Sequence, residues 1–229
     1  MPKSAHFSKE LFRFLEDLKK NNSREWFQSN KDRYEEEVKM PLLGFIGEFA
    51  GPLGKISSHF VADPRPVGGS MFRIHRDVRF AKDKSPYKNA ATAQFRHEAG
   101  KDVHAPGFYL HLEPSQCFAG AGIYHPDNPT LGKIRDRIVD DPKAWKRVRD
   151  AKAFREVWEL SGDSLVRPPR GYDPEHPFAE DLKRKDFIAV THFTERDVVK
   201  PGFLGEYVKM CKAAGAMTRY LTEAVGLPY

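Results

Sequence analysis

The sequence has few cysteines and no long apolar run, and both shortages exclude classes of protein. Its 229 residues include only two cysteines, Cys117 and Cys211, which lie far apart and form no Cys-x-x-Cys pair. A disulfide framework and a cysteine zinc cluster are therefore not expected. Spanning a bilayer takes about 20 consecutive apolar residues, and the longest uncharged stretches, such as residues 40–47, are much shorter. We expect no membrane span and no membrane partner.

The amino terminus also lacks the apolar core of a secretion signal, so we expect a cytoplasmic protein. Neither glycine-rich phosphate-binding pattern, G-x-x-x-x-G-K-S/T or G-x-G-x-x-G, occurs in the chain. Hydrophobic residues make up 40% of the sequence, with 17 Phe, 8 Tyr and 3 Trp, which is enough for a sizeable core. Since no repeat and no linker rich in glycine and serine divides the chain, we expect one soluble domain over residues 1–229.

Positive charge is concentrated in one segment. Residues 65–101 contain nine Lys or Arg and three Asp or Glu, an excess of six positive charges. This excess equals the formal net charge of the whole chain, +6. The chain has 38 bases and 32 acids in total, so the remaining residues hold 29 of each. A localised positive field attracts anions. A solvated face, or pairing with acids from elsewhere in the fold, explains the same excess, and both explanations stay open.

The spacing of apolar residues predicts helices at both ends of the chain. The first covers residues 8–20, with Ser8 as its N-cap. Asn22 and Glu25 are placed as a capping pair for a second helix, which should stop or kink before Pro41 because proline lacks the backbone donor. Further helices are expected at residues 41–53, 129–139 and 142–160, and from Pro201 onward.

Between these regions apolar residues recur at every second position, which is typical of strands. Residues 72–80 predict a strand with Phe72, Ile74, Val78 and Phe80 on one face. Other strands are expected at residues 90–95, 107–113, 117–124 and 187–193. Helices at the ends and strands in the middle indicate an α+β fold. Its mostly antiparallel central sheet, with strands in about 70–124 and 186–194, packs against amino-terminal and carboxy-terminal helices.

Arg76 is the most informative residue of the basic segment. In the strand interpretation it lies on the apolar face between Ile74 and Val78, where a guanidinium needs a carboxylate or an anionic ligand. An acid from a helix, such as Glu25 or Asp32, is one such partner. A phosphate or carboxylate bound in a pocket is the other, because the planar guanidinium matches both groups.

The loop after Arg76 strengthens the case for an anion site, because it places three lysines within seven residues and Pro86 limits its freedom. The predicted ligand-binding residues are Arg73, Arg76, Arg79, Lys82, Lys84, Tyr87 and Lys88. Weaker candidates for proton transfer are His75, Asp77 and His111, since a His and a carboxylate two positions apart can serve as base and orienter. His111 shares a strand face with Tyr109 and Glu113. We predict no metal site and no cofactor.

Four stretches of the sequence resemble one known family. The longest, residues 71–88, reads Met-Phe-Arg-Ile-His-Arg-Asp-Val-Arg-Phe-Ala-Lys-Asp-Lys-Ser-Pro-Tyr-Lys. The others are residues 22–27, residues 106–114, and residues 167–174 together with 182–187. Over nearly the whole chain the sequence is similar to the domain-of-unknown-function family 2461. The resemblance implies a single-domain, soluble, mostly bacterial and fungal protein, and it implies no activity.

Three functions remain open. The first, which we favour, is a cleft lined by Arg and Lys that binds a phosphate- or carboxylate-bearing small molecule, with or without catalysis. The second is nucleic-acid binding, in which Phe72, Phe80, Tyr87 and Phe95 stack on bases between basic residues. It ranks lower because the rest of the chain is electroneutral and no nucleic-acid-binding motif occurs. The third is a structural or interaction protein whose basic residues form internal salt bridges. The sequence gives no oligomeric state.

Overall fold

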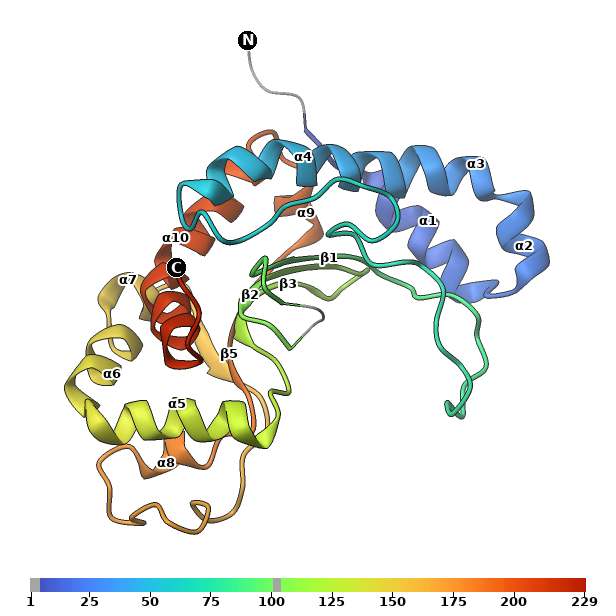
Figure 1. The fold of residues 1–229 in the computed structure, drawn as a ribbon. Helices are drawn as coiled ribbons and strands as arrows, with labels where there is room; N and C mark the ends of the chain where they lie inside the picture. Colours follow the sequence, from blue (N-terminus) through green and yellow to red (C-terminus); the bar gives the residue numbers. More distant parts are fainter. Residues whose placement is uncertain (1–4, 101–103) are drawn as a thin grey trace.

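The computed structural model describes residues 5–100 and 104–229 and contains a five-stranded antiparallel sheet (Figure 1). The strand order is β1-β2-β3-β5-β4, and every neighbouring pair is antiparallel. The strands are β1 (Ala91–Arg96), β2 (Gly107–Leu112), β3 (Cys117–Ile123), β4 (Glu159–Ser161) and β5 (Phe187–Phe193). The predicted α+β class with a mostly antiparallel sheet is confirmed.

Helices lie before, between and after the strands in the chain. The amino-terminal group is α1 (Lys9–Lys20), α2 (Arg24–Ser29), α3 (Lys31–Tyr34), the π-helical turn η1 (Glu35–Lys39) and α4 (Met40–Gly54). The later helices are α5 (Asn128–Asp140), α6 (Pro142–Arg149), α7 (Lys152–Arg155), α8 (Ala179–Leu182), α9 (Glu195–Val198) and α10 (Phe203–Ala224). Among the helices of the described residues, none combines the length and the apolar character that a membrane span requires.

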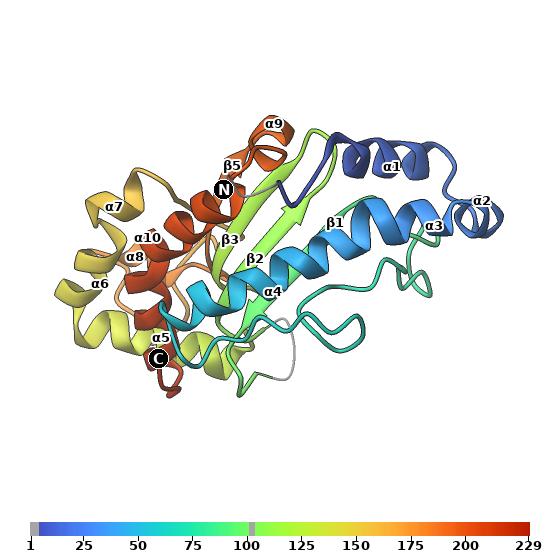
Figure 2. The same ribbon diagram turned by 90° about the horizontal axis from the view of Figure 1, so that it is seen from above.

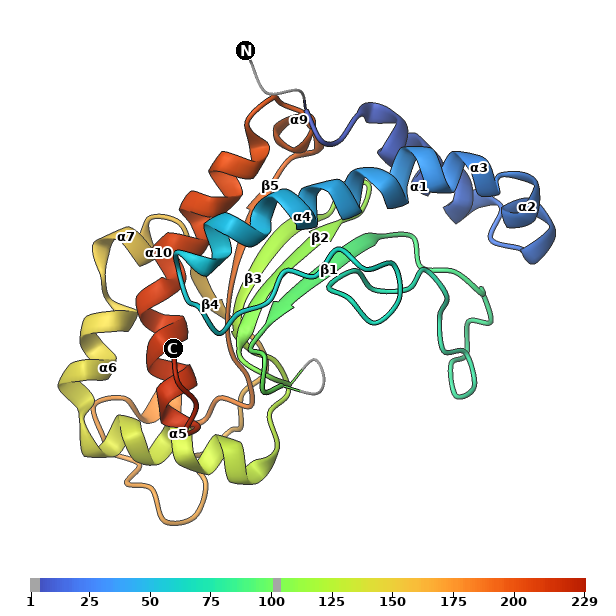
Figure 3. The ribbon, with the colours of Figure 1, turned by 45° about the horizontal axis from the view of Figure 1, so that its top comes forward.

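The helical layer covers one face of the sheet. Figures 2 and 3 show α4 and α10 crossing this face, with α1 beside α4. Strand alternation turns Ala91, Ala93 and Phe95 of β1 toward the helices, where they are almost fully buried. The Phe95 ring meets Phe49 of α4 edge-on, with ring centroids 4.7 Å apart. The intervening residues of each strand therefore face the opposite side of the sheet.

Two predictions about the amino-terminal helices are wrong. The N-cap of α2 is Ser23, whose hydroxyl accepts the Trp26 N–H, and not Asn22. The helix does not stop before Pro41 either, since α3, η1 and α4 follow one another without a break. Proline is disfavoured inside a helix because its ring clashes with the preceding turn. Just before Pro41 the Met40 N–H bonds to the Glu35 carbonyl, and this wider π-type turn accommodates the ring.

The predicted strand at residues 72–80 is also wrong. Residues 71–89, here called the arm, extend from the β1 edge of the sheet as an irregular double strand of chain (Figure 1). Only single bridges form, between Met71 and Ala93 and between His75 and Tyr87. The apolar alternation is present in the sequence, but the two halves of the arm exchange only two backbone hydrogen bonds among the described residues, from Arg76 to Pro86 and from Lys88 to Ile74. This is too little pairing for a regular strand. At its tip Phe80 is 96% exposed.

Candidate functional site

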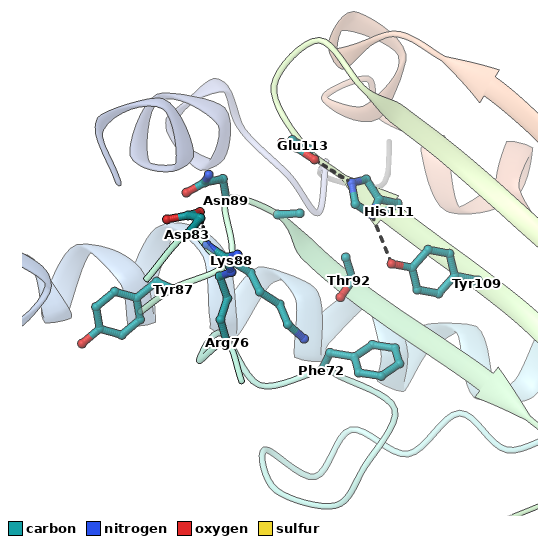
Figure 4. Close-up of a pocket in the computed structure, with 11 residues that line it drawn as sticks. Phe72, Arg76, Asp83, Tyr87, Lys88, Asn89, Thr92, Tyr109, His111 and Glu113 are labelled. Carbon is teal, nitrogen blue, oxygen red and sulfur yellow. Dashed lines mark hydrogen bonds and ion pairs between the residues drawn. The ribbon is translucent and has the colours of Figure 1, made fainter. Parts of the chain in front are cut away.

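A pocket of about 460 Å³ lies between the arm and the face of the sheet that the helices leave uncovered (Figure 4). This volume is in the range of small-molecule sites. From the arm and the residue after it come Phe72, Arg76, Asp83, Tyr87, Lys88, Asn89 and Ala90, and from the β1–β2 side come Thr92, Tyr109, His111 and Glu113. The site therefore combines the basic segment with polar residues of the neighbouring strands.

Two contacts with the amino-terminal helices fix the inner part of the arm. The Tyr87 N–H donates to Asn22 Oδ1 at 3.0 Å, and Asn22 Nδ2 donates to the Tyr87 carbonyl at 3.1 Å and to Asn89 Oδ1 at 2.9 Å. The Tyr87 ring stacks on Phe27 of α2 with centroids 4.1 Å apart. Tyr87 is consequently almost fully buried and positions the neighbouring Lys88 at the pocket.

Lys88 is the most unusual charged residue of the pocket. Its side chain is partly buried, and Nζ lies 5.1 Å from the centroid of the Phe72 ring. Burial, with a smaller contribution from the nearby Arg73 charge, lowers the pKa of Lys88 below its ordinary value. Within residues 5–100 and 104–229, no carboxylate forms an ion pair with this ammonium group. Its charge is thus desolvated without compensation from an acid.

Arg76, by contrast, has an internal partner. It forms an ion pair with Asp83 and donates to the Ser85 carbonyl at 3.3 Å. Hydrogen bonds from the Ser85 hydroxyl and N–H, together with the Arg76 guanidinium, hold the pKa of Asp83 well below its usual range. The expected partners on the helices, Glu25 and Asp32, are not used, because the arm folds back on itself and supplies its own acid.

The β2 side of the pocket carries a chain of three polar groups, drawn with dashed lines in Figure 4. The Tyr109 hydroxyl lies 3.1 Å from His111 Nδ1, and His111 Nε2 lies 3.0 Å from Glu113 Oε2. Because strand residues two apart share a face, the three side chains follow one another along β2 and its end. Phe118 of β3 stacks on the His111 ring at 4.6 Å. Burial raises the pKa of Tyr109 to about 12, against a hydrogen bond from Thr92 that lowers it.

The predicted site residues divide between the pocket and the rest of the arm. Arg76, Tyr87, Lys88 and His111 line the pocket. The others do not line it: Arg73, His75, Asp77, Arg79, Lys82 and Lys84. At the tip, Arg79 pairs with Asp77 at 2.6 Å, and Lys84 Nζ donates to the Val78 carbonyl at 2.9 Å. Lys101, counted in the basic segment, lies outside the described residues.

Several pocket residues were not predicted. Thr92 lies within the basic segment but carries no charge, and Asn22, which anchors Tyr87 without lining the pocket, lies outside that segment. Nothing local in the sequence marks either residue. Tyr109 and Glu113 are absent from the predicted ligand-binding residues, although the sequence already predicts that they share a strand face with His111, as the structure shows.

The site offers little for metal or thiol chemistry. Within the part of the chain that the structure describes, no group of three or more His, Cys, Asp or Glu residues is placed to hold a metal ion. Burial raises the pKa of the Cys117 thiol to about 11, and it also raises the pKa of Cys211, which is fully buried. Since the thiolate is the reactive form, neither cysteine has the environment of a nucleophile.

Comparison with known proteins shows the family of the chain but gives no activity. Residues 10–220 match the family described as "Conserved hypothetical protein (DUF2461)". The comparisons with curated proteins and with solved structures give no match. The family match includes nearly all of α1, the whole sheet, the arm and most of α10. The chain therefore belongs to the DUF2461 family.

Proposed function

We propose that the pocket binds a small molecule that carries a phosphate or carboxylate group. The observation that carries this proposal is the partly buried ammonium of Lys88, which reaches a pocket of ligand size and forms no ion pair with a described carboxylate. Burying a charge is unfavourable unless an opposite charge or hydrogen bonds compensate it. An anionic ligand in the pocket supplies that compensation.

The rest of the lining suits an anion of modest size. Figure 4 shows Lys88 extending from the arm toward Thr92, with the Tyr109 hydroxyl turned toward the same space. Arg76 adds a second positive group, although Asp83 partly neutralises it. Phe72 and Tyr109 meet edge to face, with centroids 6.2 Å apart, and give the pocket an apolar wall. A ligand with one anionic group and an apolar body matches this mixture.

Calorimetric titration with inorganic phosphate and malonate tests the proposal. Lys88→Met removes the ammonium group and keeps an unbranched apolar side chain over Phe72. Lys84→Met is the matched control, because Lys84 lies on the same arm but outside the pocket. We expect Lys88→Met to weaken binding at least ten-fold, since a hydrogen bond to a charged group contributes about 1.5–3 kcal/mol. Equal affinities in wild type and Lys88→Met would overturn the proposal.

A second candidate, nucleic-acid binding, rests on the arm tip. There the 96% exposed Phe80 lies beside Arg79, whose guanidinium carbon is 5.9 Å from the ring centroid. An exposed aromatic ring among cations can stack on a base while the cations contact phosphates. This function requires oligonucleotide affinity that falls steeply with salt and is lost in Phe80→Ala. Salt-insensitive binding, or binding unaffected by Phe80→Ala, would exclude it.

A further inference from the structure

The charged groups of the pocket balance one another. Arg76 and Lys88 contribute two positive charges, and Asp83 and Glu113 contribute two negative charges, so the lining is neutral while His111 is neutral. A neutral site is a poor match for a dianion, because Glu113 and Asp83 repel the second charge. One further positive charge inside the pocket would correct this mismatch, and His111 is the group that can supply it.

The hydrogen bonds of His111 define what its protonation changes. An ionised Glu113 only accepts hydrogen bonds, so the His111 nitrogen 3.0 Å from it, Nε2, carries the hydrogen. In the neutral ring Nδ1 then has only a lone pair, and the Tyr109 hydroxyl donates to it over 3.1 Å. Protonation at Nδ1 reverses this second bond. The imidazolium donates to the Tyr109 oxygen, and the Tyr109 hydrogen becomes available to a ligand in the pocket.

The surroundings of His111 couple this protonation to the ligand. Tyr109 and Glu113 of the β2 side, Thr92 of β1 and Phe118 of β3 lie next to His111, and His192 of β5 lies beyond Phe118. From the arm, Lys88, Arg76 and Asp83 line the same pocket. Lys88 and Arg76 by themselves oppose a third positive charge in the pocket, whereas Glu113 favours it. A bound dianion neutralises the cations and favours the imidazolium. Proton uptake and dianion binding therefore promote each other, as linkage requires.

We propose that the pocket takes up a dianion, such as a phosphate monoester or a dicarboxylate, together with one proton that is held on His111. This inference rests on the proposed function of the pocket. It adds the charge class of the ligand and the identity of the proton-binding group. The proton comes from solvent and forms the Nδ1–H bond, and no bond of the ligand is broken.

The test counts the protons that accompany binding. Calorimetry at one pH near 7.5, in buffers of different ionisation enthalpy, gives the number taken up per ligand. Sulfate and malonate are the probes. Both are dianions at this pH, so their own titration does not change the measured number of protons. Comparing the two distinguishes a phosphate-like ligand from a dicarboxylate. We expect a net uptake of protons on binding and an affinity that rises as the pH falls, by at most ten-fold per pH unit for one linked proton.

His111→Gln should bind the probes more weakly, with no proton uptake and no such pH dependence. His192→Gln is the matched control, because His192 is exposed on β5 and outside the pocket lining, and it should behave as wild type. If His111→Gln fails to fold, Glu113→Gln provides the second variant, and its uptake should shift to lower pH because the carboxylate that favours the imidazolium is gone.

Two results would overturn the inference, and they differ in meaning. Binding of sulfate or malonate without proton uptake, or with unchanged uptake in His111→Gln, contradicts the role of His111 and leaves the anion site intact. Failure of both probes to bind the wild-type protein contradicts the proposed function, and the inference fails with it.

Discussion

Asn22 and Tyr87, which are 65 residues apart in the chain, are joined by two hydrogen bonds in opposite directions. The amide oxygen of Asn22 accepts the Tyr87 N–H at 3.0 Å, and its amide nitrogen donates to the Tyr87 carbonyl at 3.1 Å. One side chain thus pairs with the backbone of the arm as a neighbouring strand would. This pairing connects the α1–α2 junction to the residue before Lys88 and so determines where the pocket ammonium lies.

The first prediction concerns this connection. Asn22→Ala removes three side-chain hydrogen bonds, two to Tyr87 and one to Asn89, and should lower the free energy of unfolding by about 2 kcal/mol. Phosphate affinity should fall as well, because the arm loses its anchor. Gln28→Ala, an exposed change on α2, should stay within about 0.5 kcal/mol of wild type in urea titrations. An Asn22→Ala protein as stable as Gln28→Ala would contradict this role.

The second prediction separates Arg76 from Lys88. The Arg76–Asp83 pair is partly exposed, with the two side chains 29% and 61% accessible, so Arg76→Met should lower stability by no more than about 1 kcal/mol. Anion affinity should fall a few-fold, less than in Lys88→Met. Arg79→Met breaks a comparable pair outside the pocket and should leave affinity unchanged. A loss of several kcal/mol in Arg76→Met, with affinity intact, would instead favour a structural role for the basic segment.

The third prediction uses the lowered pKa of Lys88. In the unfolded chain Lys88 keeps its ordinary pKa of 10.5. At pH values between the lowered folded-state pKa and 10.5, Lys88 therefore binds more protons in the unfolded chain than in the folded protein. The contribution of Lys88 to the free energy of unfolding therefore rises with pH through this window, and below it the buried charge destabilises the fold. Lys88→Met should raise stability at pH 7, because it removes the desolvated charge. The gain should shrink as the pH approaches 10.

Urea unfolding of wild type, Lys88→Met and Lys84→Met at neutral and alkaline pH checks this difference. Lys84→Met should show no pH-dependent gain over wild type, because the Lys84 side chain is exposed on the arm. A Lys88→Met protein that is clearly less stable than wild type at pH 7 would mean that the ammonium stabilises the fold rather than awaiting a ligand.

The fourth prediction tests the junction of α6 and α8, away from the pocket. Asp181 is 3% exposed and accepts hydrogen bonds from Trp145 Nε1 at 2.8 Å, Arg149 Nη1 at 2.8 Å and Arg184 Nε at 3.1 Å. Asp181→Ala leaves these donors without their shared acceptor and should lower the free energy of unfolding by about 3–5 kcal/mol. Glu180→Ala, on the exposed side of α8, should change it by less than about 1 kcal/mol.

Much of the fold could be predicted because its signals are local. Ser8 caps α1, and the apolar residues that follow at helical spacing are all buried. The strands β1, β2, β3 and β5 lie within one or two residues of their expected positions, since alternating residues face either the helices or the open side. The arm was mistaken for a strand because alternation alone does not supply a neighbour, and only Met71 and His75 form bridges there.

The site could be predicted only in part, because its geometry depends on contacts between distant segments. The excess of Lys and Arg marked the segment, and Arg76 and Lys88 do line the pocket. Which of the basic residues would be neutralised by a neighbouring acid could not be read from composition. The anchoring of Tyr87 by Asn22 depends on how α1 and α2 dock against the arm, which no sequence pattern describes.

The central claim is that an anion binds against Lys88 inside the pocket. Crystals soaked in selenate, a tetrahedral dianion with an anomalous signal, test it most directly. We expect an anomalous peak in the pocket beside Lys88 Nζ and the Tyr109 hydroxyl, and no such peak in crystals of Lys88→Met. Selenate found only at Arg79, Lys82 and Lys84 on the arm tip, with an empty pocket, would contradict the account.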